Sequence, residues 1–85
     1  MEIYYSLKFK RQYKKLPLSA KKQAEQIEKL FRANPFNPKL KTHKLGGQFN
    51  KYWSFSIDYQ NRIIFEFYRK GMVRFHSVGD HSIYD

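Results

Sequence analysis

The sequence predicts an α+β fold in which an antiparallel pair of helices packs on a small, mainly antiparallel sheet. Between residues 6 and 33, apolar side chains recur every three or four positions, the period of a helix with one buried face. Beyond residue 39, apolar and polar side chains alternate, which is typical of strands with one buried face. A chain of 85 residues has room for one core, so we expect a single domain over residues 1–85.

The N-terminal half begins with a strand-like stretch, Glu2 to Tyr5, before the helical period begins. Ser6 is a suitable N-cap for the first helix, and Pro17 ends it. Ser19 is expected to cap the second helix, which the two prolines of residues 34–38 stop. Because only a couple of residues separate the helices, we expect them to form an antiparallel hairpin.

The C-terminal half predicts a three-stranded meander. Its strands are expected at residues 52–58, 62–68 and 72–78, with short turns between them. Strict alternation along the third strand puts Ser77 on the inward face and Val78 on the other. We expect the N-terminal strand to join this sheet. The helices should then cover one face and leave a polar face open.

The composition excludes several classes of function. The chain has no Cys, which rules out disulfides, a thiolate nucleophile and a Cys-ligated metal. Its three His and few acidic residues lack the spacing of a zinc site, and its serines lack a nucleophile elbow. No apolar stretch resembles a signal peptide or reaches the ~18 residues of a membrane span. We therefore expect a cytoplasmic protein that needs neither a metal nor another cofactor and has no membrane partner.

The positive charge is concentrated in the N-terminal part. The chain carries 17 Lys and Arg against 7 Asp and Glu, a net charge of +10. Residues 1–51 hold 13 of the basic and 3 of the acidic groups, whereas residues 52–85 hold 4 of each. This asymmetry favours a polyanionic partner, either nucleic acid or the ribosome, with an acidic protein as the next choice. A Lys-rich face that is merely solvated is the plainer interpretation.

Polar residues of the C-terminal half form a candidate site. In a meander the start of one strand lies beside the end of the next, so Arg62 is expected near the tail that holds His81 and Tyr84. His43 lies between lysines at the entry to the sheet. Such a set suits RNA cleavage, because His exchanges protons near neutral pH, Arg holds phosphate oxygens, and an aromatic ring stacks on a base. Attack of a 2′-hydroxyl on the adjacent phosphate then needs no metal.

Each of these residues also has a structural interpretation. Arg62 can pair with Asp58 or Glu66, His43 can belong to a solvated basic loop, and the tail can be a frayed terminus. His76, within the last strand, is more often structural than catalytic. From spacing alone, the sequence predicts a basic α+β domain with RNA binding as its candidate function.

Four segments in a fixed order give a more specific indication. They read "THKLGG", "YWSFSI", "RIIF" and "GDHSIY". In this order they resemble the RelE/ParE superfamily of toxins from bacterial type II toxin–antitoxin modules, and most of all its RelE/StbE and YafQ-like branch. The resemblance covers essentially the whole chain, including the N-terminal strand and the helical hairpin.

The resemblance implies a RelE-like toxin that enters the ribosomal A site and cuts mRNA there without metal, so that translation stops. By this likeness, His43 is a candidate base or phosphate ligand, and Arg62 stabilises charge in the transition state. His81 is the candidate general acid, and Tyr84 supports the substrate base or backbone. Further contacts to mRNA or 16S rRNA would come from Lys41, Lys44 and Lys51.

Two positions depart from the family pattern. Tyr84 follows His81 by three residues, whereas the terminal aromatic of the family often follows by four. YafQ-like members also carry a histidine in the strand where this chain has Ser54 and Ser56.

The resemblance also implies a partner, and two other functions stay open. A cognate antitoxin is expected to wrap an acidic segment around the basic helical hairpin and to cover the sheet. A ParE-like toxin would instead inhibit DNA gyrase by binding, and it would not need His43 or His81. A non-catalytic RNA- or ribosome-binding module would bind through its lysines in a salt-dependent way and leave RNA intact.

Overall fold

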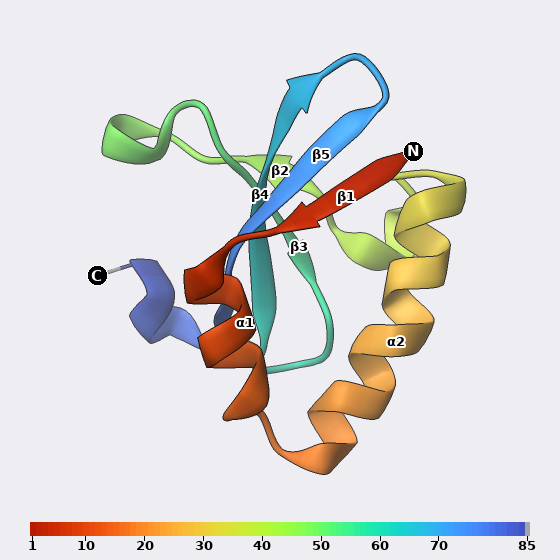
Figure 1. Ribbon diagram of the computed structural model, residues 1–85, viewed down its shortest axis with the longest axis vertical. Coiled ribbons are helices and arrows are strands. Elements are labelled where there is room, and N and C mark those ends of the chain that lie inside the picture. The colour runs from red at the N-terminus through yellow and green to blue at the C-terminus, as the bar shows by residue number, and fades with distance from the viewer. Residues whose placement is uncertain (85) are drawn as a thin grey trace.

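A computed structural model describes residues 1–84 of the chain. The described residues form five strands, two α-helices and three short 3₁₀ helices, and Figure 1 shows how they are arranged. In chain order, the elements are β1 (Glu2–Tyr5), α1 (Leu7–Lys14), α2 (Leu18–Ala33), η1 (Pro38–Leu40), β2 (His43–Lys44), η2 (Gly47–Phe49), β3 (Trp53–Ser56), β4 (Arg62–Arg69), β5 (Met72–Gly79) and η3 (His81–Tyr84).

The strands form one five-stranded sheet in the order β1-β5-β4-β3-β2. β1 runs parallel to β5, and every other neighbouring pair is antiparallel. The predicted α+β class, the meander of β3, β4 and β5, and the joining of the N-terminal strand are confirmed. In the described part of the chain, no helix is both long and apolar enough to cross a membrane.

The helix boundaries follow local chemistry. Ser6 caps α1 as predicted, because its Oγ accepts the backbone N–H of Phe9 at 2.9 Å. The same hydroxyl donates to the carbonyl of His76 at 2.7 Å, which ties the start of α1 to β5. The predicted cap at Ser19 is wrong. Pro17 is the N-cap residue and α2 begins at Leu18, so Ser19 already lies in the first helical turn.

The helix-covered face of the sheet holds an aromatic core. Phe31 of α2 meets three sheet residues, with ring centroids 4.6 Å from Phe55, 5.0 Å from Phe65 and 5.4 Å from Phe75. All four rings are fully buried. Their mutual packing fixes α2 against the middle strands, and hence fixes the frame on which the opposite face is built.

A β-bulge in β5 corrects the predicted side-chain pattern. Ser77 pairs with Ile64, but Phe75 pairs with Phe65, so His76 is an extra residue without a partner on β4. One extra residue reverses the facing of everything beyond it. Val78 therefore joins the core, whereas Ser77 turns to the other face, and strict alternation predicted the opposite for both.

The sequence predicted an open polar face opposite the helices, but the centre of this face is covered. Ser54, Ile64 and Ser77 lie there side by side across three strands, and each is fully buried. The chain after β5 returns over this row as η3, on the side of the sheet away from α2 (Figure 1). The polar face thus has a covered centre with exposed groups around it.

Candidate active site on the tail-covered face

The candidate site is built around one cross-strand row. His43 of β2 pairs with Ser54 of β3, and Ser54 pairs with Ile64 of β4. Directly opposed residues of antiparallel strands point to the same face, so His43 shares the face that η3 covers. His43 lies at the exposed end of the row, and Ser54 lies in its buried middle.

The C-terminal tail reaches this row through a tyrosine. The hydroxyl groups of Tyr84 and Ser54 are hydrogen-bonded at 2.9 Å. Gly79 makes this return possible, because a Cβ on that residue would stand 2.7 Å from Cγ2 of Ile83. Asp80 then holds the start of the turn by accepting the backbone N–H of Ser82 at 2.9 Å. The tail is therefore packed on the sheet rather than frayed.

His43 has a defined tautomer in this arrangement. Its Nδ1 lies 3.0 Å from the carbonyl oxygen of Lys41. A carbonyl only accepts hydrogen bonds, so Nδ1 carries the proton and Nε2 of the neutral ring carries the lone pair. The left-handed backbone of Lys41, at φ 54, turns its carbonyl toward the ring. The exposed ring thus offers a proton acceptor on the side away from the loop.

Arg62 begins β4 and pairs with Ser56 on one side and Gly79 on the other. The predicted nearness of Arg62 to the start of the tail is thereby confirmed at the level of the backbone. Its Nη1 donates to the carbonyls of Asp58 and Asn61 at 3.1 and 3.3 Å. These bonds engage one nitrogen of a group with five N–H donors, so the guanidinium is positioned while other donors remain for a ligand.

The two carboxylates considered as ion-pair partners of Arg62 have other roles. Asp58 accepts the backbone N–H of Asn61 at 2.7 Å and that of Gln60 at 2.9 Å, which closes the β3–β4 turn. Burial opposes ionisation of Asp58, but these hydrogen bonds, with a smaller contribution from the positive charge of Arg62, outweigh it and lower its pKa. Glu66 pairs with Arg74 at 3.5 Å.

The remaining predicted residues surround the row. His81 is exposed at the first position of η3, with its ring centroid 6.3 Å from that of Tyr84. Lys41 and Lys44 flank His43 and are exposed, and the exposed Lys51 lies over the ring of Tyr52 at 5.2 Å. The structure thus joins His43 and Tyr84 through Ser54, and it puts Arg62 beside the residue from which the tail departs.

Sequence reasoning missed three residues of this face. It did not assign Ser54 a partner, and it assigned no role to Tyr52 or to its contact with His76. Alternation does put Tyr52, Ser54 and His76 on one face, but neither the contact between Tyr52 and His76 nor the bulge at His76 has a signal in the sequence. Within residues 1–84, no three His, Asp or Glu side chains gather as a candidate metal site.

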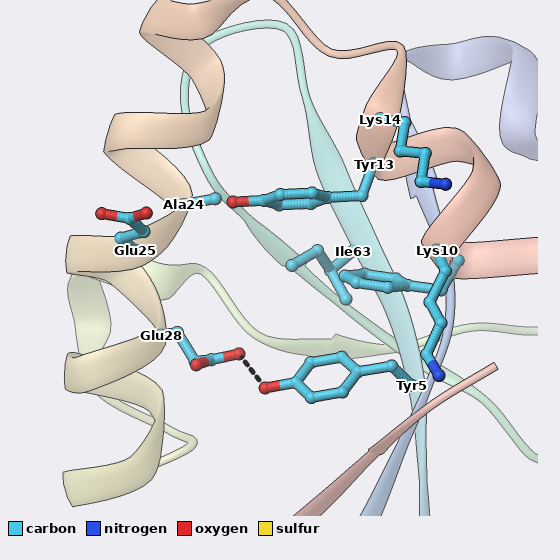
Figure 2. Close-up of a pocket in the computed structure, with 9 residues that line it drawn as sticks. Tyr5, Lys10, Tyr13, Lys14, Ala24, Glu25, Glu28 and Ile63 are labelled. Carbon is cyan, nitrogen blue, oxygen red and sulfur yellow. Dashed lines mark hydrogen bonds between the residues drawn. The ribbon is translucent and has the colours of Figure 1, made fainter. Parts of the chain in front are cut away.

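A separate hollow lies on the opposite side, between α1 and α2. It has a volume of about 410 Å³ and is lined by Tyr5, Phe9, Tyr13, Ala24 and Ile63, with Lys10, Lys14, Glu25 and Glu28 around them. Figure 2 shows the Tyr5 hydroxyl pointing at the Glu28 carboxylate, and that hydrogen bond is 2.7 Å long. Burial raises the pKa of the Tyr5 and Tyr13 hydroxyls, so both stay protonated near neutral pH. This apolar cleft suits binding rather than proton transfer.

Comparison with known proteins decides the family. Residues 1–84 match the sequence model of the family described as "Bacterial toxin of type II toxin-antitoxin system, YafQ". The chain belongs to the YafQ toxin family. The predicted membership of the RelE/ParE superfamily, on its YafQ-like side, is thus confirmed. A comparison with curated protein sequences gave no significant match.

Solved structures show the same fold at low sequence identity. Escherichia coli YafQ superimposes with a TM-score of 0.75 at 20% identity, over 98% of this chain and 96% of that chain. A YoeB/ParE toxin from Agrobacterium tumefaciens gives a TM-score of 0.80 at 18% identity, over 95% and 99%. The Escherichia coli DinJ–YafQ toxin–antitoxin complex gives 0.73 at 20% identity, over 96% and 93%.

Proposed function

We propose that this YafQ-family toxin is an endoribonuclease that cuts mRNA in the ribosomal A site by acid–base chemistry. The observation that carries the proposal is the 2.9 Å bond between Tyr84 and Ser54, since Ser54 is the strand partner of His43. Through it, two histidine-bearing segments about forty residues apart border one sheet face. Proton transfer to and from a phosphodiester needs two such groups.

The proposed reaction transfers two protons and exchanges one bond at phosphorus. The 2′-oxygen of the substrate forms a bond to the adjacent phosphorus while the bond from phosphorus to the 5′-oxygen breaks. The products are a 2′,3′-cyclic phosphate and a 5′-hydroxyl. His43 removes the 2′-proton through Nε2, the atom that its bond to Lys41 leaves as an acceptor. His81 donates a proton to the departing 5′-oxygen.

Arg62 and Tyr84 have supporting roles in this proposal. Arg62 stabilises the negative charge that builds on the phosphate oxygens, a role for which a bidentate, permanently charged group is suited. Tyr84, held by Ser54, supports the substrate base or backbone. The exposed Lys41, Lys44 and Lys51 bind phosphates of mRNA or 16S rRNA, which predicts an affinity that falls steeply with salt.

The proposed regulator is a cognate antitoxin with an acidic segment. Residues 1–51 carry all of the net positive charge, and the apolar cleft between α1 and α2 lies within that region except for Ile63. An acidic chain with apolar side chains would fit both features. If antitoxin left the helical hairpin fully accessible in a footprinting experiment, this partner assignment would be wrong.

Primer extension on a defined mRNA held on programmed ribosomes tests the function. We expect discrete new 5′ ends in the A-site codon, with a 2′,3′-cyclic phosphate on the upstream fragment and a 5′-hydroxyl on the downstream one. An upstream 3′-hydroxyl with a downstream 5′-phosphate, the products of direct attack by water, would refute the proposed 2′-hydroxyl attack. Growth arrest in cells without any new 5′ ends would refute the ribonuclease and favour inhibition of gyrase or occlusion of the ribosome.

A further inference from the structure

Two aromatic rings on the tail-covered face have no part in the proposed proton transfers. The ring centroids of Tyr52 and His76 lie 4.8 Å apart, with an angle of 46° between the ring planes. Both side chains are half-buried, so part of each ring is accessible. The pair spans three strands, since Tyr52 directly precedes β3 and His76 lies at the bulge of β5, on the far side of β4.

The position of the pair links it to the candidate site. Tyr52 directly precedes β3 and lies two residues before Ser54 in extended chain, so the two side chains point to the same face and lie roughly 7 Å from each other. His43 is the strand partner of Ser54 and therefore a diagonal neighbour of Tyr52. The ring of His76 is further fixed by a 3.1 Å hydrogen bond between Nδ1 and the Ser77 hydroxyl.

The charges around the pair suit a nucleotide. Lys51 lies over Tyr52, and Lys8 and Arg74 act on His76 with positive charge, while the Glu66 carboxylate opposes them. Burial, assisted by Lys8 and Arg74, lowers the pKa of His76, so its ring is neutral near pH 7. An uncharged ring among cations is the combination that stacks on a base while the cations meet its phosphates.

We propose that Tyr52 and His76 form a stacking platform for one base of single-stranded RNA, next to the phosphate that is cut. This inference rests on the proposed ribonuclease function and adds a binding subsite to it. The ammonium of Lys51 covers one side of Tyr52 in the absence of RNA. An exposed cation–π contact is weaker than a base–aromatic stack, so a base displaces Lys51, which then meets a phosphate.

Fluorescence of 2-aminopurine gives a direct readout of stacking. The probe is a short single-stranded RNA with 2′-O-methyl groups, which cannot be cut by 2′-hydroxyl attack, and 2-aminopurine is moved through it one position at a time. With the wild-type protein we expect strong quenching at one position. Tyr52→Leu and His76→Leu should abolish that quenching and weaken RNA binding by about 5- to 150-fold.

Three matched variants separate stacking from simple packing. Tyr52→Phe and His76→Phe retain a ring and should keep both the quenching and the affinity. Tyr13→Leu loses a comparable aromatic contact, to Phe9 at 5.8 Å, but on the helix side of the sheet, and should bind RNA as the wild type does. Thermal unfolding of each variant identifies any that fail to fold. If Tyr52→Leu is one of these, His76→Leu decides.

Three results would overturn the platform. The first is quenching that persists in both Leu variants, and the second is a wild-type protein that quenches the probe at no position. The third is a Tyr52→Leu protein that binds RNA normally and loses only its affinity for the antitoxin. The last would assign the rings to the antitoxin interface. Because the probe is not cut, a wild type that quenches it but leaves ribosomal mRNA intact would refute the ribonuclease and keep the platform.

Discussion

The two faces of this sheet are buried in different ways. Under the helices, four phenylalanine rings interlock, with Phe31 at their centre. Under the C-terminal tail, Ser54, Ile64 and Ser77 are equally inaccessible to solvent. There the tail is held on the sheet by the hydrogen bond between the hydroxyl groups of Ser54 and Tyr84. One face is closed by a large apolar area and the other by a single turn.

The residues that contribute most to folding stability therefore lie on one face of the sheet, and the residues of the candidate site lie on the other. Apolar burial is proportional to area, so most of the free energy of folding comes from the helix side. The tail side contributes few contacts and carries the histidines, the arginine and the tyrosine of the candidate site. Substitutions on the two faces should therefore differ in their effects on stability and on cleavage.

Phe31→Ala should have the largest effect. Removing a fully buried ring that contacts three others should lower the free energy of unfolding by about 3–5 kcal/mol. For a domain of this size such a loss removes most of the stability, and with it every activity. Urea denaturation measures the change. Trp53→Ala is the comparison, because its half-buried ring should cost clearly less, and equal costs would contradict a core centred on Phe31.

His81→Ala should have the opposite signature. Loss of a general acid should slow cleavage by about 10²- to 10⁴-fold, whereas the free energy of unfolding should barely change because the side chain is exposed. Single-turnover primer extension and urea denaturation measure the two quantities. Ser82→Ala, in the same turn, should cleave at nearly the wild-type rate. If His81→Ala unfolds the protein, the tail is structural.

Gly79→Ala should affect both quantities moderately. The new Cβ would stand 2.7 Å from Ile83, so η3 must move and the bond between Tyr84 and Ser54 is strained. Overpacking of this kind costs roughly 1–3 kcal/mol, and cleavage should fall with the displaced tail. Gly46→Ala is the control, since no atom lies within 4 Å of its added Cβ. Equal behaviour of the two variants would show that the packing of the tail is unimportant.

The fold was more predictable than the contacts of the site. Hydrophobic period and capping chemistry are local, so they sufficed for both helices, the meander and the Ser6 cap. They failed at Ser19, because α2 begins two residues earlier than a Ser19 cap implies, at Leu18, with Pro17 as the N-cap residue. The convergence of Arg62 with the tail was also predictable, because it follows from the antiparallel register of β4 and β5.

Contacts that depend on long-range register were not predictable. The bulge at His76 reverses Ser77 and Val78, and the alternation of apolar and polar residues in that segment does not signal it. The meeting of Ser54 with Tyr84 joins residues thirty positions apart through a turn that only Gly79 permits. Such features require the assembled sheet.

The hydroxyl pair itself gives a smaller test of the tail-side cover. Tyr84→Phe leaves the buried Ser54 hydroxyl without this partner and should cost about 1–3 kcal/mol, whereas Ser54→Ala leaves the half-buried Tyr84 hydroxyl to be solvated and should cost less. The double variant should cost less than the sum, because neither group is then left behind. Urea denaturation of the four proteins measures the coupling, and strict additivity would mean that the bond contributes nothing.

Acid should loosen the tail side through His76, with the smallest effect of the five. Burial, with Lys8 and Arg74, holds the pKa of folded His76 below its unfolded value near 6.5, so the unfolded chain binds more protons in between. The free energy of unfolding should therefore fall as the pH drops below about 6.5 toward the folded pKa. Asp58, whose pKa is also lowered, loses its contribution to stability only at more acidic pH.

Urea denaturation at pH 7.5 and 5.5 tests this effect. The free energy of unfolding should fall less between the two pH values in His76→Phe than in the wild type. An equal fall in both proteins would mean that a group other than His76 binds the proton. Packing on the tail side would then be no more sensitive to mild acid than the phenylalanine core.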